Sequence, residues 1–453
     1  MNNKLKLDYK NTLIIGFAFF AILMTWQIYN TYCPIFLKEL LNARFSSEED
    51  LLYIVGMIMA LDNLFALFMI PYFGKMSDRT DTKYGKRIPY IVGGLILTAI
   101  VFPLIAVLFL YNSLIGVILS MLLILVIMNA YRSPTVALMP DITPKPLRSQ
   151  ANGIINLTGY LGAILAGVIV LKVGYKKTTA GAYLIEPNFM NTILPFLIAS
   201  VFCLLLAFIL FFLVKEKKLL KDKAEELEIG EAVSETFSDV EGGSLSAIDK
   251  RNLIIILLAA LFWFMSFNAL ETFISTYCDE VLNDLSTAGS IAIVLTFSSI
   301  LTFIPAGMIA SKVGRKRSVI FGLILIVLAL GFMSYLNTDL TKSSLLALIS
   351  VSGVGWATIN VNSYPMLVEM ANKENIGQFT GYYYTASMTA QTITPILIGL
   401  IMSFTKFGLH ALFPYSFVLM TISLIVFYNF KEKSRKEIIE KKLSIFESFD
   451  IED

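Results

Sequence analysis

The sequence predicts an all-α membrane protein with twelve transmembrane helices in two six-helix halves. Three observations support this fold class. The 453 residues are 56% hydrophobic and only 15% charged, whereas soluble domains carry roughly 25% charged residues. Apolar runs of about 20 residues, long enough to cross a bilayer as helices, recur along the whole chain. Short motifs of the first half then return in the same order in the second half.

The expected spans follow one another with mostly short connections. Their approximate limits are 11–33, 51–74, 89–111, 113–133, 151–175, 191–214, 252–277, 288–311, 317–336, 343–366, 377–403 and 410–430. No small-residue cleavage site follows the first run, so we interpret it as a retained span. The Lys/Glu-rich segment between the sixth and seventh runs has no long apolar face. We therefore expect an N-terminal bundle at 1–214, a cytoplasmic linker at 215–250, a C-terminal bundle at 251–430 and a cytoplasmic tail at 431–453.

The distribution of Lys and Arg predicts the orientation. If both termini are cytoplasmic, the loops on that side hold 28 Lys and Arg, and the opposite loops hold 7. Cytoplasmic loops carry the excess of basic residues in membrane proteins. The sequence therefore predicts a multi-pass protein of the cell (plasma or inner) membrane with both ends inside.

The two halves are parallel repeats. A glycine followed by a short basic turn closes the second span, in Gly74–Arg87, and the eighth span, in Gly307–Arg317. The segment Ala137–Lys145 also aligns without gaps on Pro365–Lys373, which places Asp141 opposite Glu369. Parallel repeats related by an axis along the membrane normal are typical of major-facilitator transporters.

Three charged residues lie well inside the expected spans: Asp62, Arg132 and Glu271. A charge at the bilayer centre costs at least about 2.5 kcal/mol, so it persists mainly beside a wet cavity or a partner. One interpretation is a static ion pair that pins the halves together, and the other is a role in coupling or substrate binding. In the repeat Glu271 falls opposite Trp26 and Arg132 opposite Asn360, so these charges break the symmetry of a duplicated cavity.

Uncharged polar residues cluster on single faces of the other inner helices, whereas the third, sixth, ninth and twelfth spans are almost purely apolar and are expected to face lipid. Amides offer paired donors and acceptors to vicinal hydroxyls, and an aromatic face stacks on a sugar ring. The alternative is that the amides only bind helices together. The candidate substrate-binding residues are Trp26, Gln27, Asn30, Asn129, Asn156, Tyr160, Asn268, Trp356, Asn360, Tyr384 and Gln391.

Several classes of function find no support. Three cysteines do not make a disulfide framework, and a single histidine gives no histidine-rich metal site. The net charge of +2 indicates no nucleic-acid partner. We recognise no nucleotide-binding loop, metal-ligand cluster or nucleophile–base arrangement, so we expect neither an enzyme nor a cofactor. The expected partners are a small solute and the lipid bilayer, with the chain acting as a monomer.

Four motifs resemble the glycoside–pentoside–hexuronide:cation symporter family of the major facilitator superfamily, closest to its sucrose/proton branch. They are Pro71-x-x-Gly74-x-x-Ser77-Asp78-Arg79, Gly85-Lys86-Arg87-Ile88-Pro89-Tyr90, Arg132-Ser-Pro-x-x-Ala-Leu-Met-Pro-Asp141 and Asn268-Ala-Leu-Glu271-Thr-Phe. The resemblance implies symport of a sugar, a disaccharide or glycoside, with H⁺ or Na⁺ by alternating access. It also implies a cytoplasmic gate formed by Gly74, Asp78, Arg79, Gly85, Lys86, Arg87, Asp141 and Glu369.

One departure from the family favours H⁺ over Na⁺. Melibiose-type members carry two acids four and eight residues before the motif glycine, where this chain has Ile70 and Ala66. Without that pair the usual sodium site is missing, whereas a proton needs only one carboxyl in a cavity. Glu271 is the first candidate and Asp62 the second, with Arg132 modulating whichever it approaches.

The sequence leaves the cargo open. Relatives of this family also move amphiphiles, so a lysolipid or other solute carrier is an alternative, although the amide-rich faces argue against a greasy cavity. A non-transporting sugar receptor on the same frame is a further alternative. The sequence names neither the sugar nor the direction of flux.

Overall fold

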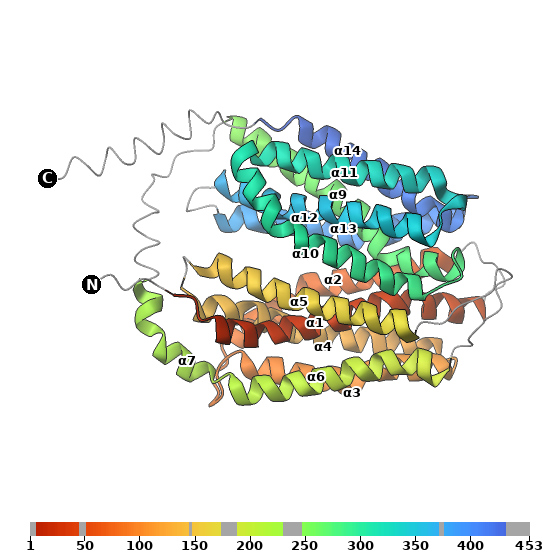
Figure 1. Cartoon of the computed structure of the whole chain (residues 1–453). Coiled ribbons are helices and arrows are strands. Elements are labelled where there is room, and N and C mark those ends of the chain that lie inside the picture. Colours follow the sequence, from red (N-terminus) through yellow and green to blue (C-terminus); the bar gives the residue numbers. More distant parts are fainter. Residues whose placement is uncertain are drawn as a thin grey trace.

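A computed structural model describes residues 6–44, 51–144, 147–173, 188–229, 247–370 and 376–431. The described chain is helical and forms two bundles that lie one above the other in Figure 1. The first bundle contains α1 (Tyr9–Asn42), α2 (Leu51–Asp78), α3 (Ile88–Leu110), α4 (Leu114–Ile142), α5 (Arg148–Val173) and α6 (Leu194–Leu213). The second contains α9 (Ala247–Glu280), α10 (Ser286–Val313), α11 (Arg315–Leu336), α12 (Lys342–Glu369), α13 (Ile376–Phe404) and α14 (Leu412–Tyr428).

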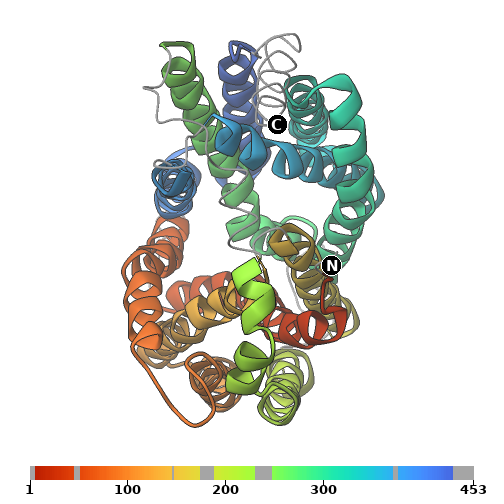
Figure 2. The ribbon, with the colours of Figure 1, turned by 90° about the vertical axis from the view of Figure 1, so that its left-hand side faces the viewer.

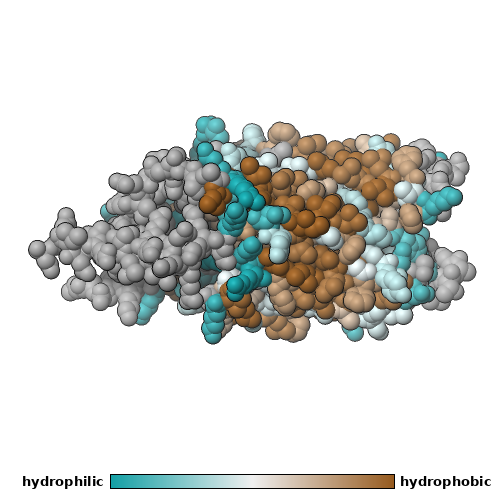
Figure 3. Space-filling view, turned by 90° about the horizontal axis from the view of Figure 1, so that it is seen from above, coloured by the Kyte–Doolittle hydropathy of each residue, from teal (hydrophilic) through white to brown (hydrophobic). Residues whose placement is uncertain are grey.

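The described residues include twelve helices that are long and apolar enough to cross a membrane. Seen from above, the molecule has a brown hydrophobic band across its middle, with hydrophilic residues toward both ends (Figure 3). The helices expected to face lipid carry large exposed apolar side chains, including Ile100 on α3, Phe208 on α6, Phe321 on α11 and Ile425 on α14. The all-α fold with twelve spans is therefore confirmed.

Several helices are longer than the expected spans, because hydropathy detects only the part that crosses the hydrocarbon. Helix α1 has 34 residues, whereas the apolar pattern predicts 11–33. Helix α4 continues to Ile142 and contains both Pro134 and Pro140. This extension places Asp141 in the last turn of α4, close to the turn between α2 and α3.

The beginning of the expected linker is structured. Helix α7 (Glu216–Asp222) follows α6 directly and lies at the end of the first bundle where the described chain begins (Figure 1). Lys217 forms an ion pair of 2.7 Å with Asp81, and Lys223 forms one of 2.9 Å with Asp8. This part of the expected linker is helical and attached to the first bundle, and its cytoplasmic position stays a prediction. The remaining linker residues 230–246 and the tail from 432 lie outside the described residues.

The two bundles meet closely at the end of the molecule away from the described chain's first and last residues, here called the far end. Lys38, near the end of α1, forms an ion pair of 3.1 Å with Glu280 at the end of α9. The backbone N–H of Tyr53 donates to Ser403 Oγ over 2.9 Å. A Cβ on Gly289 would lie only 2.5 Å from the carbonyl oxygen of Gly167, so glycine permits this contact between α5 and α10.

The opposite end, here called the near end, shows the bundles as separate groups of helices. Figure 2 views this end directly, with the first bundle below and the second above. Parts of α1, α4, α9 and α13 border the region between the two bundles. The predicted charges Arg132 and Glu271 lie in this region.

Candidate transport site

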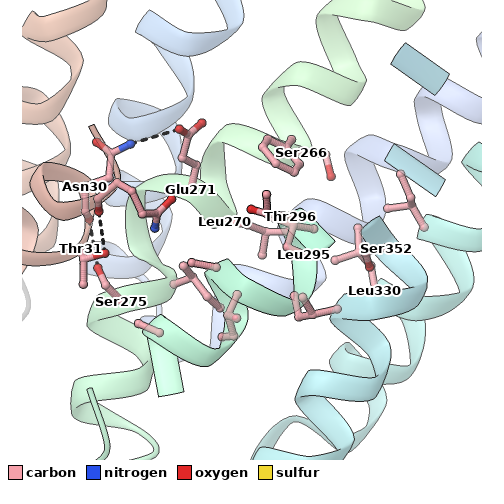
Figure 4. A pocket seen from close by; sticks show the side chains of 18 of the residues that line it. Asn30, Thr31, Ser266, Leu270, Glu271, Ser275, Leu295, Thr296, Leu330 and Ser352 are labelled. Carbon is pink, nitrogen blue, oxygen red and sulfur yellow. Dashed lines mark hydrogen bonds between the residues drawn. The ribbon is translucent and has the colours of Figure 1, made fainter. Parts of the chain in front are cut away.

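Glu271, within the membrane-crossing helix α9, joins the two bundles. Its side chain on α9 is exposed, and Asn30 Nδ2 on α1 donates to Glu271 Oε1 over 3.1 Å. One helical turn farther along α9, Ser275 Oγ donates to the carbonyl oxygen of Asn30 over 3.3 Å. Figure 4 shows Asn30, Glu271 and Ser275 facing one another. A carboxyl of the second bundle is therefore held by one residue of the first.

Arg132 brings the opposite charge to the same cluster. Its guanidinium lies over the ring of Trp26, 5.7 Å from the ring centroid, which is within the range of a cation–π contact. Trp26 in turn stacks on Tyr29 with ring centroids 6.1 Å apart. Both Trp26 and Arg132 interact with the Glu271 carboxylate, and Tyr384 of α13 interacts electrostatically with Arg132. Helices α1, α4, α9 and α13 thus converge on one charged cluster.

A cavity of about 130 Å³ opens beside this cluster and extends into the second bundle (Figure 4). Gln27, Asn30 and Glu271 line the side of the cavity that faces the first bundle, here called its mouth. Aliphatic side chains of α9, α10, α11, α12 and α14 form most of the remaining wall. They are Leu270, Ile274, Ile291, Leu295, Ile326, Leu330, Ile349 and Met420.

Three of the predicted amides are bonded within their own helices. The side-chain amides of Asn129, Asn268 and Asn360 each donate to the carbonyl oxygen four residues earlier, over 3.0, 2.7 and 2.9 Å. Asn129 and Asn268 are also buried. Their geometry favours the structural interpretation of these amides over a role in binding. Spacing alone did not distinguish them from Asn30, because all lie on polar helix faces.

The aromatic candidates and the remaining polar candidates lie in different surroundings. Tyr160 of α5 stacks on Phe303 of α10, with centroids 5.7 Å apart, so it joins the two bundles. Trp356 stacks on Phe267 with centroids 4.0 Å apart and an interplanar angle of 7°, and Phe267 lines the cavity. Gln391 donates to Ser387 Oγ over 3.0 Å. Asn156 on α5 is exposed.

The side chains of two predicted site residues are outside the part of the chain that the structure describes. Asp62 lies on α2 and Glu369 at the end of α12, but both side chains fall outside the described residues. The roles expected for them in coupling and in the gate stay predictions. Within the part of the chain that the structure describes, no group of three or more His, Cys, Asp and Glu could hold a metal ion.

The predicted gate residues form an ionic cluster around Arg87 at the near end. Arg87 Nη2 lies 2.5 Å from Asp78 Oδ1, and its Nε donates to Asp141 Oδ2 over 2.9 Å. A further nitrogen, Nη1, donates to Ser77 Oγ. Burial opposes the charge and lowers the pKa of Arg87, but the bonds to Asp141 and Asp78 outweigh it and raise the pKa above its ordinary value. Arg87 therefore remains a cation at every physiological pH.

The other gate residues have different surroundings. A Cβ on Gly74 would lie 2.8 Å from Ser133 Oγ, so the glycine lets α2 approach α4. Arg79 and Lys86 are exposed, and their charged groups face solvent at the near end. Of the basic residues in this turn, Arg87 is thus the one that the two carboxylates hold.

Glu216, the first residue of α7, completes the Arg87 cluster. Its buried carboxylate accepts hydrogen bonds from the backbone N–H groups of Lys86, Arg87 and Ile88, over 2.8, 2.9 and 3.0 Å. These donors stand at the beginning of α3, from the two residues before it to its first residue Ile88, where unpaired N–H groups and the helix dipole favour an anion. Gly85, with φ of 117°, permits the approach, since a Cβ there would lie 2.2 Å from the Glu216 carboxylate.

Sequence reasoning missed both Glu216 and the Lys38–Glu280 pair. Glu216 lies about 130 residues from the turn that it caps, and it stands in a segment with many similar charges. Neither Lys38 nor Glu280 falls opposite a charge in the repeat. The general preference for an acid near a helix N-terminus applies to local sequence and gives no signal across such a distance.

The described residues form twelve membrane-crossing helices in two bundles with a charged cluster between them, an arrangement typical of secondary transporters. The Major Facilitator Superfamily model matches residues 15–284 and 280–448. The chain therefore belongs to the major facilitator superfamily, whose members are transporters and not enzymes.

Individual relatives are distant. An "Uncharacterized protein in sodM 3'region" of Geobacillus stearothermophilus is 26% identical over 182 residues, which cover 39% of this chain and 80% of that protein. Among solved structures, a D-xylose–proton symporter has a TM-score of 0.69 at 12% identity, covering 94% of this chain and 99% of that one. A bacterial homologue of the iron transporter ferroportin, in an inward-facing state, has a TM-score of 0.64 at 14% identity, covering 95% and 100%. These similarities show the fold.

Proposed function

We propose that the chain is a proton-coupled symporter that carries a sugar, a disaccharide or glycoside, across the cell membrane by alternating access. One observation carries the proposal: Glu271, a titratable carboxyl within a membrane span, is hydrogen-bonded to Asn30 of the opposite bundle and lies in one cluster with Arg132. The sugar–proton symporter among the structural neighbours supports it by analogy of fold. Family motifs around Gly74 and Arg132 favour the glycoside–pentoside–hexuronide group.

Protonation of Glu271 changes the forces that hold the bundles together. The ionised carboxylate attracts Arg132 and accepts strongly from Asn30, since hydrogen bonds to a charged acceptor are roughly twice as strong as neutral ones. When the carboxyl takes a proton, the attraction to Arg132 is lost and the bond to Asn30 weakens. A proton thereby loosens the contact between α1 and α9 that must open for the other face to become accessible.

The same cluster provides groups suited to a sugar. Gln27 and Asn30 line the mouth of the cavity and present amides to hydroxyl groups. The ring of Trp26, on the same helix, could stack on the apolar side of a sugar ring if Arg132 moved away from it. A sugar that binds here touches residues of both bundles, and binding therefore depends on their relative position. Coupling of the sugar to the proton follows if both ligands favour the same state.

The bundles in this structure meet at the far end, through Lys38 and Glu280 and through Tyr53 and Ser403. The excess of basic residues in the loops of the near end favours a cytoplasmic position for that end. Together these observations support an inward-facing state. Alternating access then requires the far-end contacts to separate and the near ends to approach each other.

Purified protein in liposomes tests the proposal. A panel of mono- and disaccharides and their glycosides is offered outside under an imposed inward proton gradient, with a protonophore as the matched control. We expect at least one sugar to accumulate above equilibrium, and we expect the protonophore to abolish accumulation. If no member of the panel responds to the gradient, sugar–proton symport is excluded for this chain.

A further inference from the structure

The interior of the cavity beside Glu271 is apolar, whereas its mouth is polar. Beyond Gln27, Asn30 and Glu271 its wall is mostly aliphatic, and Phe267 adds an aromatic side chain that is stacked against Trp356. The polar mouth and the apolar interior meet along α9, because Leu270 and Ile274 flank Glu271 on that helix. A solute bound across this boundary meets two different environments.

Five hydroxyl side chains line the cavity: Thr31, Ser266, Ser275 and Ser352 donate to backbone carbonyls, whereas no such bond is described for Thr296. Ser266 Oγ donates to Ser416 O over 2.7 Å, and Ser352 Oγ donates to Leu348 O over 3.0 Å. Ser275 Oγ donates to the carbonyl oxygen of Asn30. These three hydroxyl protons are therefore not offered to a ligand. A hydroxylated sugar ring placed deep in the cavity would lose its hydrogen bonds to water and gain few in return, which is unfavourable.

The size of the cavity fits one small apolar group. Its volume is about 130 Å³, and an engineered apolar cavity of roughly 150 Å³ in another protein stays dry and binds benzene. A phenyl ring or a branched chain of similar size is therefore the largest group that this space accepts without movement of the wall.

On this basis, and building on the proposed symport of a sugar or glycoside, we propose that the cavity is a subsite for the apolar aglycone of the transported solute. The sugar ring lies at the mouth, where Gln27, Asn30 and Glu271 present polar groups, and the aglycone enters between α9, α10, α11 and α12. The preferred substrate class is then an aryl or short branched-alkyl glycoside and not a disaccharide. A disaccharide has two hydroxylated rings, and the described wall of this cavity, which is mostly aliphatic, offers few hydrogen-bonding groups for the second ring.

Pairs of glycosides that share the sugar and differ only in the aglycone test this inference. Methyl and phenyl glycosides of α- and β-glucose and of α- and β-galactose are compared for uptake and for competition by the full-length protein in liposomes under an inward proton gradient. Transfer of a phenyl ring out of water is favourable by roughly 25 cal/mol per Å² of apolar surface. We expect the phenyl member of the transported pair to have an apparent KM about 30-fold lower than its methyl partner.

A variant with a filled cavity tests whether the aglycone binds there, and a leucine elsewhere on the same helix is its control. Ser352→Leu places a larger apolar side chain in the cavity, and the serine hydroxyl that it removes bonds only to the backbone of its own helix among the bonds described here. Ser350→Leu on the same helix is the control, because Ser350 does not line the cavity. Ser352→Leu is expected to raise the apparent KM of the phenyl glycoside toward that of its methyl partner and so to remove the preference. Ser350→Leu is expected to leave both values unchanged.

The outcomes separate this inference from the proposed function. If wild-type protein accumulates glycosides but does not distinguish phenyl from methyl members in any pair, the aglycone subsite is overturned and sugar symport stands. If Ser352→Leu keeps the full preference, the cavity is not the subsite. If no glycoside accumulates, both proposals fail. Ser352→Val, a smaller filling change, gives a second test should the leucine variant fail to fold, with a partial loss of preference expected.

Discussion

The charged clusters around Arg87 and Glu271 are built in opposite ways. Arg87 is only 6% exposed and is held by Asp78, Asp141 and Ser77, and Glu216 caps the turn beside it. Glu271 is exposed between the bundles and accepts a hydrogen bond from Asn30, with Arg132 nearby. The first cluster lies within one bundle, and the second connects the two.

The difference separates charges that hold a structure from charges that can change state. A buried cation needs its anionic partners, so the Arg87 cluster resists rearrangement. The Glu271 carboxyl is exposed and lines a cavity, so it can gain a proton or exchange a partner at smaller cost. Substitutions in the two clusters are therefore expected to affect different properties.

Arg87→Ala is expected to have the largest effect on stability. It removes the cation from a buried site and leaves Asp78 and Asp141 facing each other, at a cost of about 3 kcal/mol in the free energy of unfolding. Thermal or denaturant unfolding of the purified protein in detergent measures this change. Arg79→Ala, an exposed neighbour in the same turn, is the control and should change stability by less than about 0.5 kcal/mol. Equal losses in the two variants would contradict the structural role of Arg87.

Glu216→Ala is expected to have the next largest effect. Three backbone N–H groups at the beginning of α3 lose their acceptor, which costs about 2 kcal/mol. Glu216→Gln keeps one acceptor oxygen and should lose about half as much. Unfolding in detergent again gives the values, and Glu225→Ala on the exposed part of the linker is the matched control. A loss no larger than that of Glu225→Ala would show that the cap contributes nothing.

Lys38→Met is expected to change the equilibrium between the closed and open arrangements of the far end more than the free energy of unfolding. Lys38 is 9% exposed and pairs with Glu280 across the far end, so its loss should weaken closure there by about 1 kcal/mol. Spin labels on the far ends of α1 and α9 would report a larger population of long distances by electron paramagnetic resonance. Lys406→Met, an exposed lysine at the same end, should leave the distance distribution unchanged. If the distance distribution of Lys38→Met equals that of the wild type, the Lys38–Glu280 ion pair does not contribute to closure of the far end.

Glu271→Gln is expected to have the smallest effect on stability. The amide oxygen still accepts from Asn30, and the side chain faces the space between the bundles, so the free energy of unfolding should change by less than about 0.5 kcal/mol. Asn30→Ala, which removes the donor, is the comparison within the same contact. A large loss of stability in Glu271→Gln would place Glu271 with Arg87 among the structural charges and erase the contrast between the clusters.

The fold was largely predictable because its signals are local. Apolar runs of membrane length and the repeat of Asp141 on Glu369 define twelve spans and two halves without any tertiary information. The family resemblance named Asp78, Arg87 and Asp141 as gate residues, and the structure brings these three side chains together, although their role in a gate stays a prediction. Glu216 was not predicted, since its partner turn is far away in the sequence.

The central cluster was predicted only in part. Glu271, Arg132, Trp26 and Asn30 come together as the sparse charges of the spans suggested. Asn129 has the same side chain as Asn30 and also lies on a polar face, yet it is buried and bonded to its own helix. The rotation of a helix within its bundle decides between these outcomes, and a single sequence does not fix that rotation. The apolar cavity was missed because its wall comes from five helices whose aliphatic residues carry no distinctive pattern.

Uptake by the Glu271→Gln variant tests the central claim most directly. The variant and the wild type are placed in liposomes with the solute that the panel identifies, and accumulation under a proton gradient is compared with exchange in the absence of a gradient. The account predicts that Glu271→Gln loses accumulation against a solute gradient and retains exchange. Undiminished proton-driven accumulation by Glu271→Gln would contradict it.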